Sequence, residues 1–264
     1  MSAVYCVKEI YIYPIKSLAG ISLNRAKAEE MGFENDRRWM LIDVDNVHVT
    51  QREYPIMSQF YPEISNGKIT ISFENDKHEF SIDEHLNVSI ESAVWEDKSE
   101  VFEVNQNTSK WFSDKLGFEC KLVKINKIGA RKHESSKTKE TYNVSFADAY
   151  PYLLIGTESL DFLNEKLEEK ITIKRFRPNI VVSTKSAHEE DDFKSFKIGE
   201  VQFENIKPCG RCIMVNNDPQ KGIIKKEPLK TLSKYRNVNN SVLFGTNIVS
   251  LNSGIISVGD EVVF

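Results

Sequence analysis

Short apolar segments that alternate with polar residues, separated by turns, restrict the fold of this chain more than any other feature of its sequence. Residues 4–13 place Val4, Cys6, Ile10 and Ile12 on such a pattern, and Pro14 ends it. Alternation with a period of two is typical of β-strands that bury one face. Because the strands of the first hundred residues follow one another without intervening helices, they predict a barrel or a sandwich rather than a parallel sheet. Further strands of this kind are expected at residues 21–28, 38–44, 47–50, 69–73, 79–82, 88–90 and 101–104.

Few helices interrupt this pattern. The first predicted helix covers residues 107–116, begins at a cap supplied by Asn107 or Thr108, and ends at Gly117. A second helix is expected from Thr157 to about residue 169, and a third over residues 229–235. Strands are expected at residues 120–125, 152–155, 180–183, 199–206, 242–251 and 255–264. We therefore expect a mainly β fold, of β-barrel type, with a few helices.

The length of 264 residues allows one large domain or two small ones. A polar stretch at residues 126–141, with Lys127, Arg131, Lys132 and His133, is the only concentrated basic segment, and we place a domain join near residues 117–145. The prediction is an N-terminal domain over residues 1–120 and a C-terminal domain over residues 121–264. The basic stretch suits a solvated surface loop or a cover for an anionic ligand.

The charge balance and the apolar runs exclude several classes of function. Thirty-five Lys and Arg against 39 Asp and Glu give a net charge of -4, which disfavours general nucleic-acid binding. The longest apolar runs, such as residues 150–155, fall far short of the ~20 residues that a membrane helix needs. The N-terminus lacks a positive segment followed by an apolar one, so we expect no secretory signal and a cytoplasmic protein.

Cys209 and Cys212, which stand three positions apart, are the sharpest candidates for chemistry. Zinc would need two more ligands, and neither a second cysteine pair nor a histidine after His188 supplies them. A thioredoxin-like dithiol needs a strand-to-helix junction, whereas residues 213–219 predict a strand and a turn. These points disfavour zinc and a redox dithiol without removing them, and the other two alternatives are a thiolate ligand to a soft metal held mainly by a cofactor and a pair of buried inert thiols. The polar surroundings, which include Arg211, fit inert thiols poorly.

Basic residues gather at three further places in the sequence. These are Lys16 with Ser17 after the first strand, Arg37 with Arg38 before a later strand, and Arg175 with Arg177 beside Pro178. Two guanidinium groups next to a turn suit an oxyanion or a phosphate. For Arg175 and Arg177, surface ion pairs explain the spacing equally well. For Arg37 and Arg38, a group of charges at the start of a strand is the favoured explanation, and Lys16 with Ser17 is a weak signal alone.

In their order along the chain, these segments resemble the MOSC-domain family, in its form with a preceding MOSC N-terminal β-barrel domain. The chain is similar to the mitochondrial amidoxime-reducing component and its bacterial relatives, and more distantly to the C-terminal part of molybdenum cofactor sulfurase. The resemblance implies a MOSC β-barrel domain plus a smaller N-terminal α/β domain. The segments that carry it are Tyr13-Pro14-Ile15-Lys16-Ser17, residues 32–39, Arg175-Phe176-Arg177-Pro178-Asn179, Cys209-Gly210-Arg211-Cys212, Asp218-Pro219, Lys226-Glu227-Pro228-Leu229 and Leu243-Phe244-Gly245.

The resemblance also implies a molybdenum cofactor and the residues that hold it. Cys212 is the implied molybdenum ligand, beside the two sulfurs of the pterin, and tungsten would satisfy the same ligands. A soft thiolate suits such a metal, and a few convergent basic residues let an acidic chain hold an anion. The residues implied to contact the pterin phosphate and ring are Lys16, Ser17, Arg37, Arg177 and Asn179, and those implied to line the rest of the cofactor are Tyr150, Pro151, Gly210, Arg211 and Asn247.

For function, the resemblance implies the reduction of N-hydroxylated compounds such as amidoximes and hydroxylamines. Asp218 is a candidate proton relay, although turn preferences favour a turn-forming role before Pro219. Because the sequence shows no haem segment and no cysteines for an iron–sulfur cluster, electrons are expected from a separate cytochrome b5-like or ferredoxin-like protein. The alternative is a carrier that binds the cofactor, or a persulfide on Cys209 or Cys212, without its own reductase activity. Pyridoxal phosphate binding is also associated with the family, but the sequence shows no pyridoxal-phosphate domain, so we do not expect a complete sulfurase.

Overall fold

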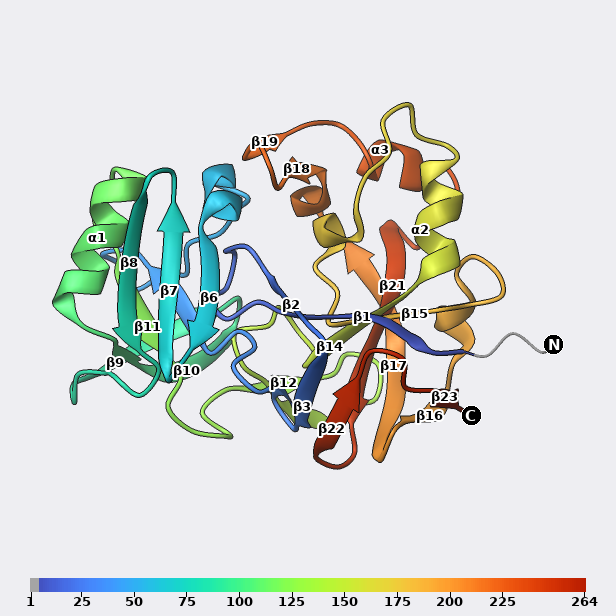
Figure 1. Cartoon of the computed structure of the whole chain (residues 1–264), viewed down its shortest axis with the longest axis horizontal. Coiled ribbons are helices and arrows are strands. Elements are labelled where there is room, and N and C mark those ends of the chain that lie inside the picture. The colour runs from blue at the N-terminus through green and yellow to red at the C-terminus, as the bar shows by residue number, and fades with distance from the viewer. Residues whose placement is uncertain (1–4) are drawn as a thin grey trace.

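The computed structural model describes residues 5–264, and this part of the chain is mainly β with three α-helices. The expected fold class is therefore confirmed. The described chain forms two bodies, seen as the left and right halves of Figure 1. Val4 of the expected first strand, and the chain start on which we based the absence of a secretory signal, lie outside the described residues. Within residues 5–264, no helix has the length and apolar character that crossing a membrane requires.

The body on the left of Figure 1 consists of residues 39–125. One sheet has the order β5-β11-β10-β9, a second has the order β6-β7-β8, and all neighbours are antiparallel. Helix α1 (Gln106–Leu116) packs Phe112 into a core with Phe60 and Leu122. The strands are β5 (Trp39–Ile42), β6 (Tyr61–Ser65), β7 (Lys68–Phe73), β8 (Asp76–Ser81), β9 (Ser89–Val94), β10 (Asp97–Glu103) and β11 (Lys121–Lys124).

The cap of α1 differs from the prediction. Asn105, rather than Asn107 or Thr108, is the cap, because its side chain accepts a hydrogen bond of 2.7 Å from the Thr108 amide. The predicted end is confirmed, since Gly117 adopts a left-handed conformation with φ of 80°.

The body on the right of Figure 1 is organised by a large sheet of order β2-β1-β15-β14-β21-β17-β16-β23, with β20 paired to β21. Only β14 and β15 run parallel among the pairs of this sheet. Alternate residues of one strand enter different cores, as Ile10 and Tyr11 do. The strands are β1 (Val7–Ile12), β2 (Ile21–Leu23), β14 (Tyr152–Gly156), β15 (Ile180–Val182), β16 (Ser195–Ile198), β17 (Val201–Arg211), β20 (Asn237–Val238), β21 (Ser241–Ser250) and β23 (Val262–Val263).

The first strands of the chain lie in the sheets of its C-terminal half. Strand β1 pairs with β15, and β3 (Arg25–Glu29) pairs with β22 (Gly254–Ser257) and β4 (Gly32–Phe33). The division of the chain near residue 120 stays a prediction, and these hydrogen bonds show that the polypeptide crosses between the bodies more than once. Residues 13–18 and 36–38 therefore lie at the junction, where the Lys16 amide donates to the Trp39 carbonyl over 2.7 Å.

The polar stretch at residues 126–141 is more ordered than a surface loop. It contains β12 (Lys132–Glu134), which pairs with β13 (Thr141–Asn143). Arg131 was predicted to lie in a surface loop, but it is 0% exposed. Its guanidinium is buried against the backbone of Ser145 and Ala147, whose carbonyls it binds. The hydrogen bonds of this buried guanidinium hold the stretch against the rest of the protein.

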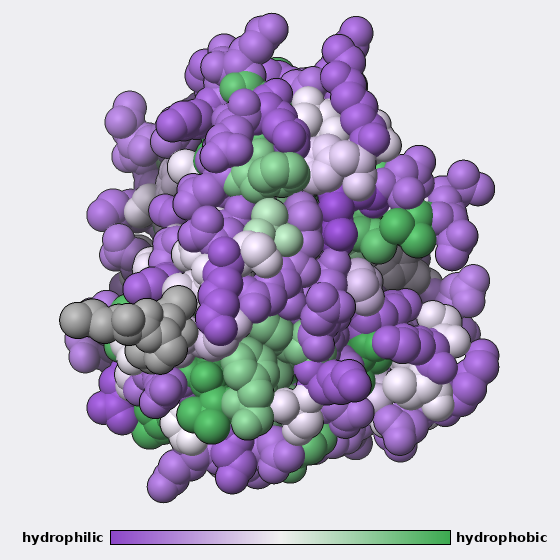
Figure 2. All heavy atoms as spheres, turned by 90° about the vertical axis from the view of Figure 1, so that its right-hand side faces the viewer, coloured by the Kyte–Doolittle hydropathy of each residue, from purple (hydrophilic) through white to green (hydrophobic). Residues whose placement is uncertain are grey.

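The remaining elements are short. Helix α2 (Thr157–Asn164) ends earlier than predicted, and its N-cap is Gly156 rather than the predicted Thr157. Residues Ile213–Asn216 form a 3-10 helix instead of the expected strand, followed by β18 (Asn217–Asp218), β19 (Ile223–Ile224) and α3 (Leu229–Leu232). Further 3-10 helices cover Pro55–Gln59, Ile173–Phe176 and Glu189–Asp192. Figure 2 shows that the side carrying the two termini is mostly hydrophilic, with an apolar area near the chain ends.

Candidate functional site

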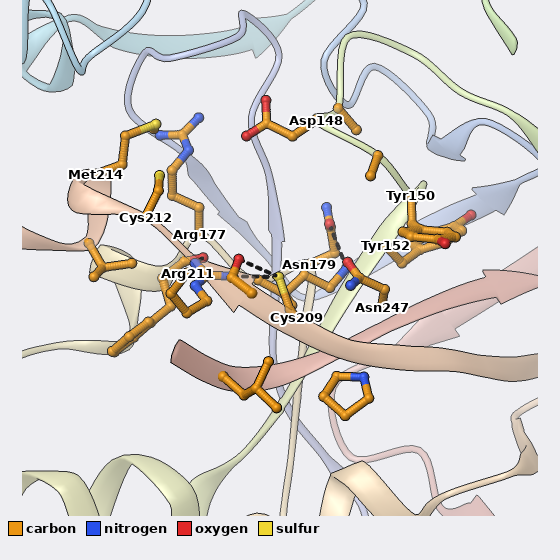
Figure 3. Close-up of a pocket in the computed structure, with 18 of the residues that line it drawn as sticks. Asp148, Tyr150, Tyr152, Arg177, Asn179, Cys209, Arg211, Cys212, Met214 and Asn247 are labelled. Carbon is orange, nitrogen blue, oxygen red and sulfur yellow. Dashed lines mark hydrogen bonds between the residues drawn. The ribbon is translucent and has the colours of Figure 1, made fainter. Parts of the chain in front are cut away.

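A cavity of about 530 Å³ lies at the junction between the two bodies. Its walls come from the connection after β1, from residues 147–153, from the 3-10 helix before β15, and from the ends of β17 and β21. Figure 3 shows side chains from these segments converging on one space. The volume falls within the range of small-molecule sites.

The structure brings ten of the predicted site residues to this cavity. They are Lys16, Ser17, Arg37, Tyr150, Arg177, Asn179, Gly210, Arg211, Cys212 and Asn247. Pro151 is buried, and its carbonyl lies against Gly32 rather than on the wall. Asp218 also lies off the wall, where it pairs with Arg175 over 3.5 Å and accepts a hydrogen bond from the Gln220 amide. The second contact fits a turn-forming role, and the proton-relay role of Asp218 stays a prediction.

Lys16 and Asp148 form the centre of an ion-pair network at one end of the cavity. The Lys16 ammonium donates to Asp148 over 2.5 Å and to the Phe146 carbonyl over 2.9 Å. Burial lowers the pKa of Lys16 to about 8, and the Asp148 carboxylate opposes this shift. Desolvation raises the pKa of Asp148, but Lys16, Arg52 and Arg37 outweigh it and hold that pKa well below its usual range. Asp148 therefore stays ionised at neutral pH.

Arg131 fixes the backbone that carries Asp148. Its guanidinium donates to the carbonyls of Ser145 and Ala147 over 2.7 and 2.5 Å, and to the carboxylate of Asp97 over 2.8 Å. These bonds pair both terminal nitrogens of the guanidinium, which offsets much of the cost of burying its charge. The polar loop thus has a structural role beside the cavity, which the basic stretch in the sequence did not reveal.

Arg37 is held in place by buried acceptors. It donates to Asp36 over 2.5 Å and to Asn179 over 3.1 Å, and Asp36 also accepts from the Tyr13 amide. Asn179 bonds the Tyr11 carbonyl and the Leu153 amide, so that it ties β1 to β14. This network explains why Asp36 and Asn179 are almost fully buried.

Arg177 is a cation of the cavity wall whose charge is poorly compensated. Its guanidinium donates to the Leu18 carbonyl over 2.6 Å and lies 4.2 Å from the centre of the Tyr13 ring. No carboxylate within residues 5–264 forms an ion pair with it, and burial lowers the pKa of Arg177 to about 10. Ser17, Arg37 and Arg177 all have positive φ angles between 52° and 67°. Such strained backbone at three wall residues is typical of functional sites.

The two neighbouring cysteines lie at the end of β17, on the cavity wall. Cys209 is half-buried and accepts a hydrogen bond of 3.1 Å from Arg211, whereas the thiol-bearing side chain of Cys212 is exposed. In Figure 3, Cys212 lies on the same side as Met214 and Arg177, opposite Tyr150 and Tyr152. Arg211 also donates to the Phe176 carbonyl over 2.5 Å, and its buried Nε has no partner among the described residues.

The cysteine pair is not part of a preformed cluster of metal-ligating side chains. Within residues 5–264 there is no group of three or more His, Cys, Asp or Glu that could hold a metal ion. Cys6 bonds Ser183 and Cys120 bonds Ser113, both away from this cavity. A metal at Cys212 therefore needs further ligands that belong to a cofactor.

Sequence reasoning missed several residues of the wall. Arg52 and Asp148 stand alone in the sequence, and Met214 and Ser241 belong to no motif, so no local pattern identified them. Lys207 was also missed, although it lies two residues before Cys209 on the strand that ends at the cysteine pair.

The charge of the wall favours an anionic ligand. Among the described residues that line the cavity, seven are Lys or Arg and one, Asp148, is a carboxylate. Basic residues that converge in a partly desolvated site attract anions even when the whole chain is acidic. An exposed thiol on the same wall adds a soft ligand for a metal. The donor set thus fits a phosphate-bearing cofactor that brings a soft metal.

Comparisons with known proteins agree with this chemistry. The family model described as MOSC domain matches residues 141–263, and the one described as MOSC N-terminal beta barrel domain matches residues 4–119. Mitochondrial amidoxime reducing component 2 of Bos taurus is 32% identical over 97% of this chain and 82% of its own length. Mitochondrial amidoxime-reducing component 1 of Mus musculus is 30% identical over 97% of this chain and 81% of its own length.

A longer relative matches as well. Molybdenum cofactor sulfurase of Arabidopsis thaliana is 32% identical over 97% of this chain, and the chain spans 35% of the length of that protein.

Proposed function

Since the chain belongs to the MOSC-domain family, with the MOSC N-terminal β-barrel domain, we propose that it is a molybdenum-cofactor-dependent reductase of N-hydroxylated compounds such as amidoximes and hydroxylamines. The observation that carries the proposal is an exposed thiol, Cys212, on the wall of a strongly basic cavity. The chain also spans about four fifths of relatives named for amidoxime reduction, against about a third of the sulfurase.

The residues present fit the cofactor. Arg177 has no ion pair, and the buried Nε of Arg211 has no acceptor within the described chain, so both suit the oxygens of a phosphate. We assign the pterin phosphate and ring to Lys16, Ser17, Arg37, Arg177 and Asn179, and the metal to Cys212. The bound cofactor supplies two-electron chemistry at an N–O bond.

The protein's own contribution is to hold the cofactor and to position the substrate. Lys16 and Asp148 stay together as a charged pair beside the site, which fixes the ammonium for an anion. Tyr150 and Asn247 form the wall opposite Cys212. The Cys209 sulfur accepts from Arg211, and this bond orients the segment that leads to Cys212.

Electrons would come from a separate protein of the cytochrome b5-like or ferredoxin-like kind. The exposure of Cys212 supports this part of the proposal, because a docked donor reaches a metal at an exposed ligand over a short distance. The cytoplasmic location expected from the sequence stays a prediction.

Reduction of benzamidoxime with methyl viologen as electron donor tests the proposal on protein purified from a host that makes the cofactor. We expect turnover by the wild-type protein and at least a hundredfold loss in Cys212→Ser, since the thiolate is the only protein ligand proposed for the metal. Cys6→Ser is the matched control, because Cys6 lies away from the cavity, and it should keep its activity. Cofactor-loaded protein without N-reduction would contradict the proposal.

One observation favours a second function, that of a cofactor or sulfur carrier. The sulfurase of Arabidopsis thaliana matches almost the whole chain, and the exposed Cys212 is able to bear a persulfide. A carrier should release the cofactor to an apo acceptor enzyme within minutes, whereas a reductase should retain it through gel filtration.

A further inference from the structure

A second cavity, of about 270 Å³, lies beside the first. One of its sides comes from residues 19–20 and 51–61, and the other from residues 172–177 and 214–220, so it also lies between the two bodies. Arg175, Arg177 and Met214 line both cavities. Because Met214 and Arg177 lie on the side of Cys212 in Figure 3, the second cavity borders the end of the first that carries the proposed metal ligand.

The walls of the second cavity combine aromatic rings with positive charge. Tyr11, Tyr13 and Tyr61 supply the rings, and Lys174, Arg175 and Arg177 supply the charge. None of the described residues that line it is Asp or Glu. Arg175 is compensated by Asp218, but Lys174 is exposed and forms no ion pair within residues 5–264. A flat ring with an anionic substituent suits such walls.

Two buried polar atoms at these walls have no partner among the described residues. They are the Tyr13 hydroxyl and the Asn217 Oδ1, and both residues are only 2% exposed. A buried polar atom without a hydrogen bond destabilises the folded protein, because it has lost its contact with water and gained no partner. Protein side chains normally avoid this unless a ligand supplies the missing partner, so the pair points to a polar ligand.

The rings and the amide are held in place before any ligand binds. The Tyr13 ring centre lies 4.7 and 4.2 Å from the guanidinium carbons of Arg37 and Arg177, and the ring lies against Gly20. A Cβ at Gly20 would lie 2.4 Å from this ring, so only glycine leaves room for it. Asn217 is fixed because its Nδ2 donates to Gln51 and to the Pro55 carbonyl over 3.2 and 3.0 Å. The cavity is therefore a built site that spans both bodies.

We propose that the second cavity binds the body of the substrate, and that it selects planar aromatic N-hydroxylated compounds that carry a carboxylate. The ring lies among the tyrosines, the carboxylate faces Lys174, and the N-hydroxyl group points past Met214 towards Cys212. This inference rests on the proposed reductase function, and it names the class of substrate that the site prefers.

Binding affinity measured without an electron donor tests the selection separately from turnover. The probes are 4-carboxybenzamidoxime, neutral benzamidoxime and the cationic 4-aminomethylbenzamidoxime, titrated calorimetrically into the cofactor-loaded protein. We expect the carboxylate to bind at least tenfold more tightly than the cationic probe. Lys174→Glu should weaken the binding of 4-carboxybenzamidoxime about tenfold, and Tyr13→Phe should weaken it about threefold. Lys170→Glu, an equal charge change at an exposed residue that does not line the cavity, should leave the affinity unchanged.

The outcomes separate the two proposals. Equal affinity for the three probes, or equal effects of Lys174→Glu and Lys170→Glu, would overturn the second cavity as the selecting site. Selective binding of the carboxylate without turnover by methyl viologen would support this inference and contradict the reductase function instead.

Discussion

The two ends of the larger cavity differ in how their charges are compensated. At the Asp148 end, Lys16 and Arg52 pair with one carboxylate, at 2.5 and 3.3 Å. At the Cys212 end, Arg177 lacks an ion pair and the Nε of Arg211 lacks an acceptor within the described chain. The cations of the first end already share a carboxylate, whereas the guanidinium groups of the second end leave more of their charge to a ligand.

This difference distinguishes residues that stabilise the cavity from residues that bind a ligand in it. Compensated charges stabilise the protein without a ligand, whereas uncompensated buried charges destabilise it until an anion arrives. Substitutions of Asp148, or of the Arg131 that holds its backbone, should therefore mainly change stability, and substitutions at the Cys212 end should mainly change the content of cofactor. Three variants examine this contrast, in order of decreasing effect.

Arg131→Met should have the largest effect, a loss of about 3–5 kcal/mol in the free energy of unfolding. It leaves Asp97 and the carbonyls of Ser145 and Ala147 without their buried donor. Urea denaturation measures the loss, and Lys132→Met, at the exposed neighbour, is the matched control. If the two variants are equally stable, Arg131 does not anchor this end of the cavity.

Arg177→Met should lower the pterin content of the purified protein at least tenfold, because it removes the uncompensated cation. The stability of the cofactor-free variant should not fall, because the lost guanidinium is bonded to one carbonyl only and its charge is uncompensated. Arg38→Met is the control, because Arg38 contacts Glu29 away from the cavity. Normal pterin content in the Arg177 variant would contradict the view that the Cys212 end leaves its charge to the cofactor.

Asp148→Asn should have the smallest effect, of the order of 1 kcal/mol, because half of the side chain is exposed. The pKa of Asp148 is lower in the folded state than in the unfolded chain. Its contribution is therefore complete above the unfolded pKa, about 4, and is lost as the pH falls through the folded pKa. Urea midpoints should differ between wild type and variant at pH 7 and converge in strong acid. A difference independent of pH would contradict the ion-pair account.

Local patterns predicted much of the fold. Strands β7 and β8 follow from alternation, and the end of α1 at Gly117 follows from a helix stop signal; both signals depend on neighbouring residues. The pairing of β3 with β22 could not be predicted, because it joins residues more than 220 positions apart. The burial of Arg131 was missed for the same reason, since its acceptor Asp97 lies in another segment of the chain.

The candidate site shows the same limit. The family resemblance predicted that Lys16, Arg177 and Cys212 share one site, and all three line the larger cavity. Their roles stay proposals. No sequence pattern indicated Asp148, whose position depends on the Arg131 contacts. The second cavity was also beyond prediction, because its walls come from both bodies.

The central claim, that Cys212 binds the metal of a pterin cofactor, is tested most directly by the molybdenum and pterin content of two matched variants. Cys212→Ser and Cys209→Ser change neighbouring thiols on the same wall. We expect Cys212→Ser to lose its molybdenum and Cys209→Ser to keep it, with wild-type protein containing metal and pterin in equal amounts. Full molybdenum in Cys212→Ser, or loss in Cys209→Ser alone, would contradict the assignment.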